Sequence, residues 1–61
     1  MPMFKVVVEC SGEVGDAVLT YRNVSATSSS AAAFHTCQKA GEYYPEYTDI
    51  RATMAEYEIE G

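Results

Sequence analysis

The residues Ser28–Ala40, with the sequence SSSAAAFHTCQKA, form the one segment of the chain that has a strong helical pattern. A serine at its start can cap the helix, because a serine oxygen accepts a hydrogen bond from an early backbone N–H that has no other partner. Gly41 suits the left-handed residue that closes many helices, and Pro45 prevents continuation. The segment therefore predicts a helix of about three and a half turns, and the other residues must supply what this helix packs against.

The predicted helix has only a narrow apolar side. Ala33, Phe34, Cys37 and Ala40 or Gly41 recur at three- and four-residue spacing, and Phe34 is the only large side chain among them. Small alanines let a helix come close to a sheet. The pattern predicts that this stripe, with Phe34 included, lies on a sheet.

The residues before the helix predict two strands joined as a hairpin. Phe4–Cys10 is rich in valine and alternates, so its even-numbered residues are expected to face the helix. Ser11–Asp16 contains two glycines and two acids and predicts a loop, after which Ala17–Val24 predicts the second strand. The expected core side of this second strand consists of Ala17, Leu19 and Tyr21.

The residues after the helix predict a loop over Glu42–Thr48 and a third strand over Asp49–Glu60. The apolar alternation changes phase within this strand. Ile50, Ala52 and Met54 fall in one phase, whereas Ala55, Tyr57 and Ile59 fall in the other. A bulge near Met54 and Ala55 would turn both sets toward the core; alternatively, Ile50 belongs to the preceding loop.

The order strand, strand, helix, strand predicts one α+β domain spanning residues 1–61. We expect a three-stranded antiparallel sheet in the order 2-1-3, with the helix packed on one face and a right-handed crossover. A chain of this length buries only roughly 60% of its unfolded surface. Small domains often gain stability from a partner, so the size fits a monomer that binds another protein or a weak homodimer.

The charge of the chain excludes several classes of partner. Nine acidic residues against four basic ones give a net charge of −5, and the basic residues are Lys5, Arg22, Lys39 and Arg51. Direct binding to nucleic acid or to an anionic membrane needs clustered basic residues and is therefore disfavoured. The N-terminal residues show no signal-peptide pattern, and no apolar run approaches the roughly 20 residues of a spanning helix. We expect a cytoplasmic protein whose partner is a basic protein surface.

No catalytic or metal-binding motif can be assembled from the sequence. Cys10 and Cys37 belong to no C-x-x-C pair, and His35 is the only histidine, so the chain cannot supply four Cys and His ligands for zinc. The two cysteines are expected to be buried free thiols, with a disulfide or a reactive thiol as the alternative. Gly12 and Gly15 lie among acids, which is the wrong charge for a phosphate loop. The sequence predicts no enzyme, no cofactor and no metal.

The acidic residues lie outside the helix and are the main candidates for function. In the last strand Glu56, Glu58 and Glu60 alternate, with an expected spacing of about 6.6 Å that resembles neighbouring phosphates of a nucleic-acid strand. The full set of predicted partner-binding residues is Glu13, Asp16, Glu42, Tyr43, Glu46, Tyr47, Asp49, Glu56, Glu58 and Glu60. Tyrosine is included because it is enriched at interfaces. Alternatively, the acids form a solvated edge that prevents aggregation, and the tyrosines only cover a small core.

The passage Val24–Ala32, in which a strand end enters an alanine helix, occurs in a very short acidic chain without an enzyme motif. In this whole-chain character the protein resembles the small phage-encoded anti-CRISPR proteins, especially acidic inhibitors of type I (Cascade-type) systems. The group has no common functional motif, so no site residue is carried over. The resemblance implies a non-enzymatic DNA mimic that acts in the infected bacterial cell, where it binds a Cas subunit that recognises target DNA and blocks DNA binding. The alternative is a small homodimeric structural or regulatory module of a phage or mobile element.

Overall fold

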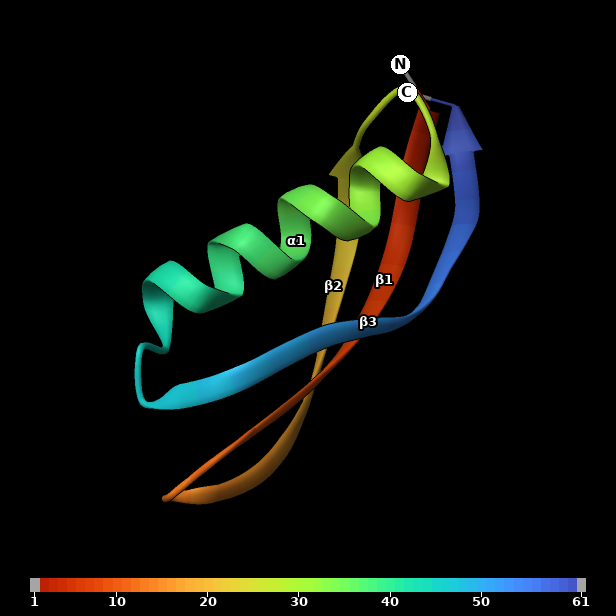
Figure 1. The fold of residues 1–61 in the computed structure, drawn as a ribbon. Helices are drawn as coiled ribbons and strands as arrows, with labels where there is room; N and C mark the ends of the chain where they lie inside the picture. Colours follow the sequence, from red (N-terminus) through yellow and green to blue (C-terminus); the bar gives the residue numbers. More distant parts are fainter. Residues whose placement is uncertain (1, 61) are drawn as a thin grey trace.

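A computed structural model describes the backbone of residues 2–60 and the side chains as far as Glu58. It contains strand β1 (Pro2–Gly12), strand β2 (Gly15–Ser25), helix α1 (Ser29–Tyr43) and strand β3 (Tyr47–Glu60). The strands form one antiparallel sheet in the order β2-β1-β3, and α1 crosses one face of it (Figure 1). The predicted α+β fold, its strand order and the position of its helix are confirmed.

Strand β1 lies at the centre of the sheet and supplies most of the core. Phe4, Val6, Val8 and Cys10 are buried on the side of the sheet that faces α1, as the alternation predicts. β-Branched residues such as valine pack well on a pleated surface. Leu19 and Tyr21 of β2 pack against this group on the predicted side, and Ala17 is half-buried.

The hairpin between β1 and β2 is tighter than the predicted loop over residues 11–16. Only Glu13 and Val14 lie outside the strands, because Gly12 already pairs with Gly15. Gly15 has a φ of 120°, a conformation that glycine adopts without a steric penalty. Glycine at this position allows a turn of only two residues, so the β1–β2 ladder continues to the residues that flank the turn.

Strand β3 follows β1 through three register shifts. One of them leaves Thr53 without a paired residue between Ala52 and Met54, and the Thr53 hydroxyl donates to the Val7 carbonyl at 3.3 Å. The predicted bulge is therefore confirmed to within a residue, and Ile50 and Ala55 both pack against the core. The alternative, in which Ile50 belongs to a loop, is wrong because β3 begins at Tyr47.

Two side chains of β3 do not face the core as predicted. Met54 is exposed on the other face because it pairs with Val7, which points away from α1. Tyr57 is 55% exposed, although its ring meets the Phe4 ring edge-on at a centroid distance of 5.9 Å. Tyr57 belongs to the edge strand β3, which has a neighbouring strand on one side only. The prediction for the Ile59 side chain lies outside the described side chains.

Helix α1 begins as predicted and ends later. Ser28 is the N-cap, and its hydroxyl oxygen accepts from the Ala31 N–H at 3.2 Å. Gly41 does not close the helix, since Gly15 is the only described glycine with positive φ. The ladder instead continues to Tyr44, whose N–H donates to the Ala40 carbonyl at 2.9 Å, and Pro45 follows directly. With Pro45 as the stop, the glycine four residues earlier is not needed as a terminator.

The helix packs a stripe that overlaps the predicted one only in part, because Ala40 belongs to both. Its buried residues are Ala32, Thr36 and Ala40, spaced by four, whereas Phe34 is 65% exposed and lies against the His35 ring. Residues four apart share one side of a helix, and three small side chains there let the helix backbone come close to the valines of β1. A phenylalanine on that line would hold the helix away. Cys37 of the predicted stripe is half-buried against the core.

Candidate functional site

Acidic residues from two distant parts of the chain meet at one end of the sheet. At this end Gly12 pairs with Tyr47, and a Cβ placed on Gly12 would lie 2.6 Å from the carbonyl oxygen of Glu46. The absence of a side chain at Gly12 thus lets the segment after α1 approach the hairpin. As a result the predicted residues Glu13 and Glu46 belong to the same end of the molecule.

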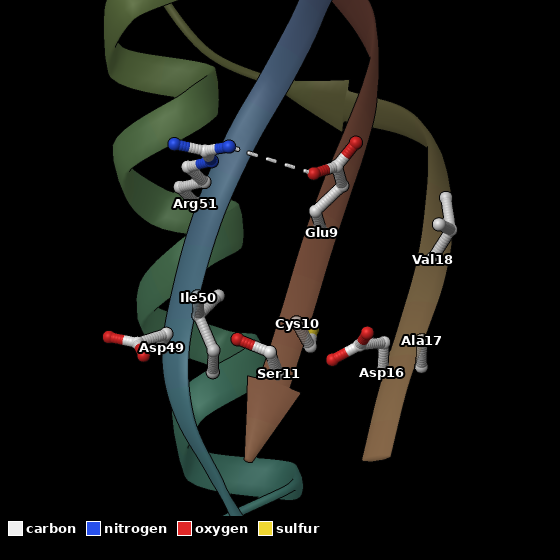
Figure 2. Close-up of a pocket in the computed structure, with 9 residues that line it drawn as sticks. All are labelled: Glu9, Cys10, Ser11, Asp16, Ala17, Val18, Asp49, Ile50 and Arg51. Carbon is white, nitrogen blue, oxygen red and sulfur yellow. Dashed lines mark ion pairs between the residues drawn. The ribbon is translucent and has the colours of Figure 1, made fainter.

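A hollow of about 510 Å³ lies at this acidic end, on the sheet face opposite α1 (Figure 2). Ser11 occupies its middle, with Asp16 paired to it on β2 and Asp49 paired to it on β3. Glu9 is two residues further along β1. The residues that line the hollow are Glu9, Cys10, Ser11, Asp16, Ala17, Val18, Asp49, Ile50 and Arg51. Asp16 points toward Ser11, whereas the Asp49 carboxylate points outward from β3, away from β1 (Figure 2).

The only basic side chain of the hollow is Arg51. Its guanidinium lies 3.9 Å from a Glu9 carboxylate oxygen, and both side chains are largely exposed. An exposed pair at this distance contributes little, because water and salt screen it. Neither Asp16 nor Asp49 belongs to an ion pair of the described residues. The hollow keeps a negative potential and suits a lysine or arginine side chain.

The prediction included Asp16 and Asp49 but not Glu9 or Arg51. The sequence did contain a signal for both. Glu9 occupies an odd-numbered position of a strand whose even-numbered residues are buried, so it must lie on the face away from the helix. Arg51 pairs with Glu9 in the ladder, and this register depends on the bulge at Thr53.

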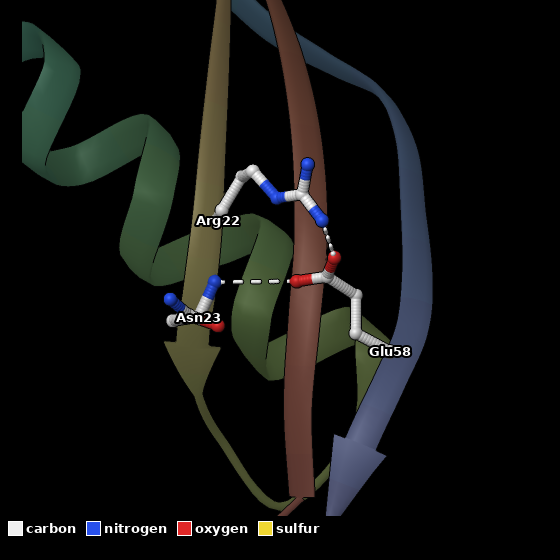
Figure 3. A network of polar contacts seen from close by, with 3 residues as sticks. All are labelled: Arg22, Asn23 and Glu58. Carbon is white, nitrogen blue, oxygen red and sulfur yellow. Dashed lines mark hydrogen bonds and ion pairs between the residues drawn. The ribbon is translucent and has the colours of Figure 1, made fainter.

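The acids of the last strand do not form the predicted row of free carboxylates. Glu56 is exposed and pairs in the ladder with Lys5. Glu58 reaches across β1 to Arg22, with 2.6 Å between the carboxylate and the guanidinium, and its side chain is only 15% exposed (Figure 3). The prediction for Glu60 lies outside the described side chains.

Two irregularities in the sheet, one in each ladder, place Glu58 close to Arg22. Arg22 and Asn23 together oppose the single residue Lys5 in the β1–β2 ladder, and Glu58 is the unpaired residue of a shift in the β1–β3 ladder. Asn23 has a φ of 56°, in the left-handed region that asparagine tolerates. Its backbone N–H donates to the second Glu58 oxygen at 3.3 Å. This hydrogen bond, followed by the charge of Arg22, lowers the pKa of the Glu58 carboxyl below its ordinary value.

The predicted tyrosines divide between the surface and the core. Glu42 and Tyr43 belong to the last turn of α1 and not to the predicted loop, and both are exposed and available to a partner. Tyr47 instead packs against the core, and its ring lies 6.3 Å from that of Tyr44. Burial raises the pKa of Tyr21, and the neighbouring Tyr44 hydroxyl raises it further. Of the two tyrosines predicted to bind a partner, Tyr43 is therefore the exposed one.

The cysteines are free, with Cys10 buried and Cys37 half-buried. Burial raises the pKa of the Cys10 thiol, and Cys37 nearby raises it further, so Cys10 stays protonated and poorly nucleophilic at neutral pH. In residues 2–58 no group of three or more His, Cys, Asp or Glu side chains is arranged to hold a metal ion. No helix in the described part of the chain is long and apolar enough to cross a membrane.

Comparison of the chain with protein-family models, with curated proteins and with solved structures gave no match.

Proposed function

We propose that the protein is a non-enzymatic binding protein whose acidic end occupies a basic groove of a nucleic-acid-handling protein and keeps nucleic acid out. The observation that carries the proposal is the hollow that Glu9, Asp16 and Asp49 line with Arg51 as its one basic side chain. Glu13 and Glu46 extend the negative surface around the same end of the sheet.

The placement of the two aspartates fits the side chain of a basic partner. Asp16 and Asp49 flank Ser11 from the two neighbouring strands, and two strand spacings amount to about 10 Å. Asp16 could hold a guanidinium or ammonium group beside the Ser11 hydroxyl, and Asp49, which points outward from the edge strand, could take a second basic side chain (Figure 2). A groove that normally holds phosphates presents such groups in rows, and a rigid sheet can present the carboxylates to them without prior ordering.

The partner we propose is the subunit of a type I CRISPR complex that recognises target DNA. The resemblance of the chain to acidic anti-CRISPR proteins suggests this subunit. The net charge of −5 supports a partner whose surface is positive. The working surface differs from the one expected from sequence. It lies at the hairpin end of the sheet and not along Glu56 and Glu58, because Glu58 is already neutralised by Arg22.

Charge reversal at single positions tests the proposal. Asp16→Lys and Asp49→Lys should each weaken binding to a purified Cascade complex by at least about tenfold, since a desolvated charge pair across an interface is replaced by repulsion. Glu56→Lys is the matched control: it makes the same charge change at an exposed carboxylate outside the hollow and should have a much smaller effect. Affinities are measured by biolayer interferometry at two salt concentrations.

Equal losses in all three variants would mean that only net charge matters, and unchanged affinity in Asp16→Lys and Asp49→Lys would remove the acidic end as the binding surface. Circular dichroism of each variant shows whether the fold is intact.

A second function is supported by a different observation on the sheet face opposite α1, called here the open sheet face. Each basic side chain on it has an acidic neighbour: Arg22 pairs with Glu58, Arg51 lies near Glu9, and Lys5 is opposite Glu56 in the ladder. Exposed apolar side chains, chiefly Val18 and Met54, lie among them. A face that combines paired charges with apolar positions suits a second copy of the chain, so this candidate is a homodimeric interaction module.

A further inference from the structure

A second hollow lies between the helix and strand β2, on the side of the sheet that carries α1. Its volume is about 460 Å³, within the range of small-molecule sites. The residues that line it are Tyr21, Asn23, Val24, Ser25, His35, Thr36 and Lys39. It shares no lining residue with the acidic hollow, so the proposed function leaves it unused.

The charge of this hollow is opposite to that of the molecule. None of its lining residues is acidic, although the chain carries a net charge of −5. His35 and Lys39 are four residues apart, so they project from the same side of α1 on successive turns. The two ion pairs of the described residues are Arg22–Glu58 and Arg51–Glu9. The Lys39 ammonium therefore has no carboxylate partner within the described part of the chain.

A buried hydroxyl without a partner belongs to the same hollow. Thr36 is 3% exposed, and its Oγ1 makes no hydrogen bond among the described residues. Buried hydroxyls in proteins are rarely left in this state. Protein atoms cover Oγ1 as the side chain stands, but threonine in a helix has two accessible χ1 rotamers. Rotation would exchange the methyl group and the hydroxyl, and a group bound in the hollow could then accept from Oγ1.

We propose that this hollow binds a small organic anion, a carboxylate or a phosphate ester. Lys39 supplies the charge, Thr36 supplies a hydrogen-bond donor, and the Tyr21 ring with Val24 forms the wall against which the organic part packs. Asn23 and His35 add polar groups at the rim. Binding of an anion here is independent of the acidic end and would remain if the proposed function failed.

The test is titration of ¹⁵N-labelled protein with benzoate and with phenyl phosphate, followed by NMR amide shifts. We expect shifts at residues 21–25 and 35–39, and a much weaker response to benzamide, which has a similar ring and no charge. Lys39→Gln should weaken anion binding by about threefold to tenfold. Thr36→Val, which keeps the side-chain shape and removes the hydroxyl, should also weaken it.

Lys5→Gln is the matched control, because it removes one positive charge from the opposite face of the sheet and should leave anion binding unchanged. Binding of only one of the two anions would support the site and define its ligand class. The proposal is overturned if neither anion shifts these amides, if benzamide binds as well as benzoate, or if Lys39→Gln and Lys5→Gln have equal effects.

Discussion

Glu58 lies on an edge strand, yet its side chain is neither fully solvated nor free of a partner. Its two carboxylate oxygens accept from the Arg22 guanidinium and from the Asn23 backbone N–H, on the far strand of the sheet. The side chain therefore lies over Lys5 of β1 and connects the two outer strands. An acid in this position contributes to the stability of the sheet and is unavailable to a partner.

The substitution Glu58→Gln should make the stability of the protein less dependent on pH. The folded-state pKa of Glu58 is lowered, so its contribution to the free energy of unfolding is present above the unfolded-state pKa. That contribution is lost as the pH falls through the lowered folded-state value. Urea unfolding at neutral pH should show Glu58→Gln to be less stable than the parent protein, and the difference should shrink toward about pH 3.

The control for this prediction is Glu56→Gln, which removes the same charge from an exposed position of the same strand. At neutral pH Glu56→Gln should lower the free energy of unfolding less than Glu58→Gln does. A stability difference for Glu58→Gln that stays constant from neutral to acid pH would contradict the assigned ion pair.

At the scale of the helix, the buried line of small residues sets the distance between α1 and the sheet. Ala32→Leu should lower the free energy of unfolding by about 1–3 kcal/mol, because extra atoms in a packed core force shifts of side chains or backbone. Phe34→Ala removes a much larger apolar side chain, but an exposed one, and should change stability by no more than about 0.5 kcal/mol. Urea unfolding followed by circular dichroism compares the two.

The prediction from the sequence alone is the reverse, since Phe34 there belongs to the packed stripe. A larger loss of stability for Phe34→Ala than for Ala32→Leu would therefore support the predicted stripe and contradict the packing of α1 described above.

The strands were more predictable than the face of the helix, for a physical reason. Alternation in β1 separates valines from charged residues, so its buried side follows from a period of two. In α1 small, apolar and polar residues are mixed around the helix. Thr36 has a polar side chain, which predicts exposure, although it is buried. Asp16 and Asp49 of the site were predicted from the sequence, whereas Glu9 was not. Their gathering in one hollow could not be predicted, because it depends on the Gly12–Tyr47 approach and on three register shifts.

At the scale of the whole molecule, the two functional candidates predict different masses. A protein that works through its acidic end is expected to stay monomeric, with a mass of 6.7 kDa in sedimentation equilibrium from micromolar to millimolar concentration. The open sheet face also borders the acidic hollow, since Val18 and Arg51 belong to both. A dimer through this face would therefore cover the hollow.

A mass that rises toward twice the monomer value would favour the homodimeric module. In that case Val18→Lys, which places a charge on a side chain that is 65% exposed, should return the protein to the monomer. A rise that Val18→Lys does not reverse would place the contact elsewhere on the molecule.

The central position of β1 has a consequence for the newly made chain. Of the three described strands β1 leaves the ribosome first, yet one of its hydrogen-bonding edges pairs with β3, which follows the other two. Until β3 arrives, β1 and β2 form a hairpin with a valine-rich unpaired edge that can pair with other chains. Contacts between the two ends of a chain also slow folding. Synthesis that stops before β3 would thus release a fragment prone to aggregation, and the acidic end would form only once β3 has been made.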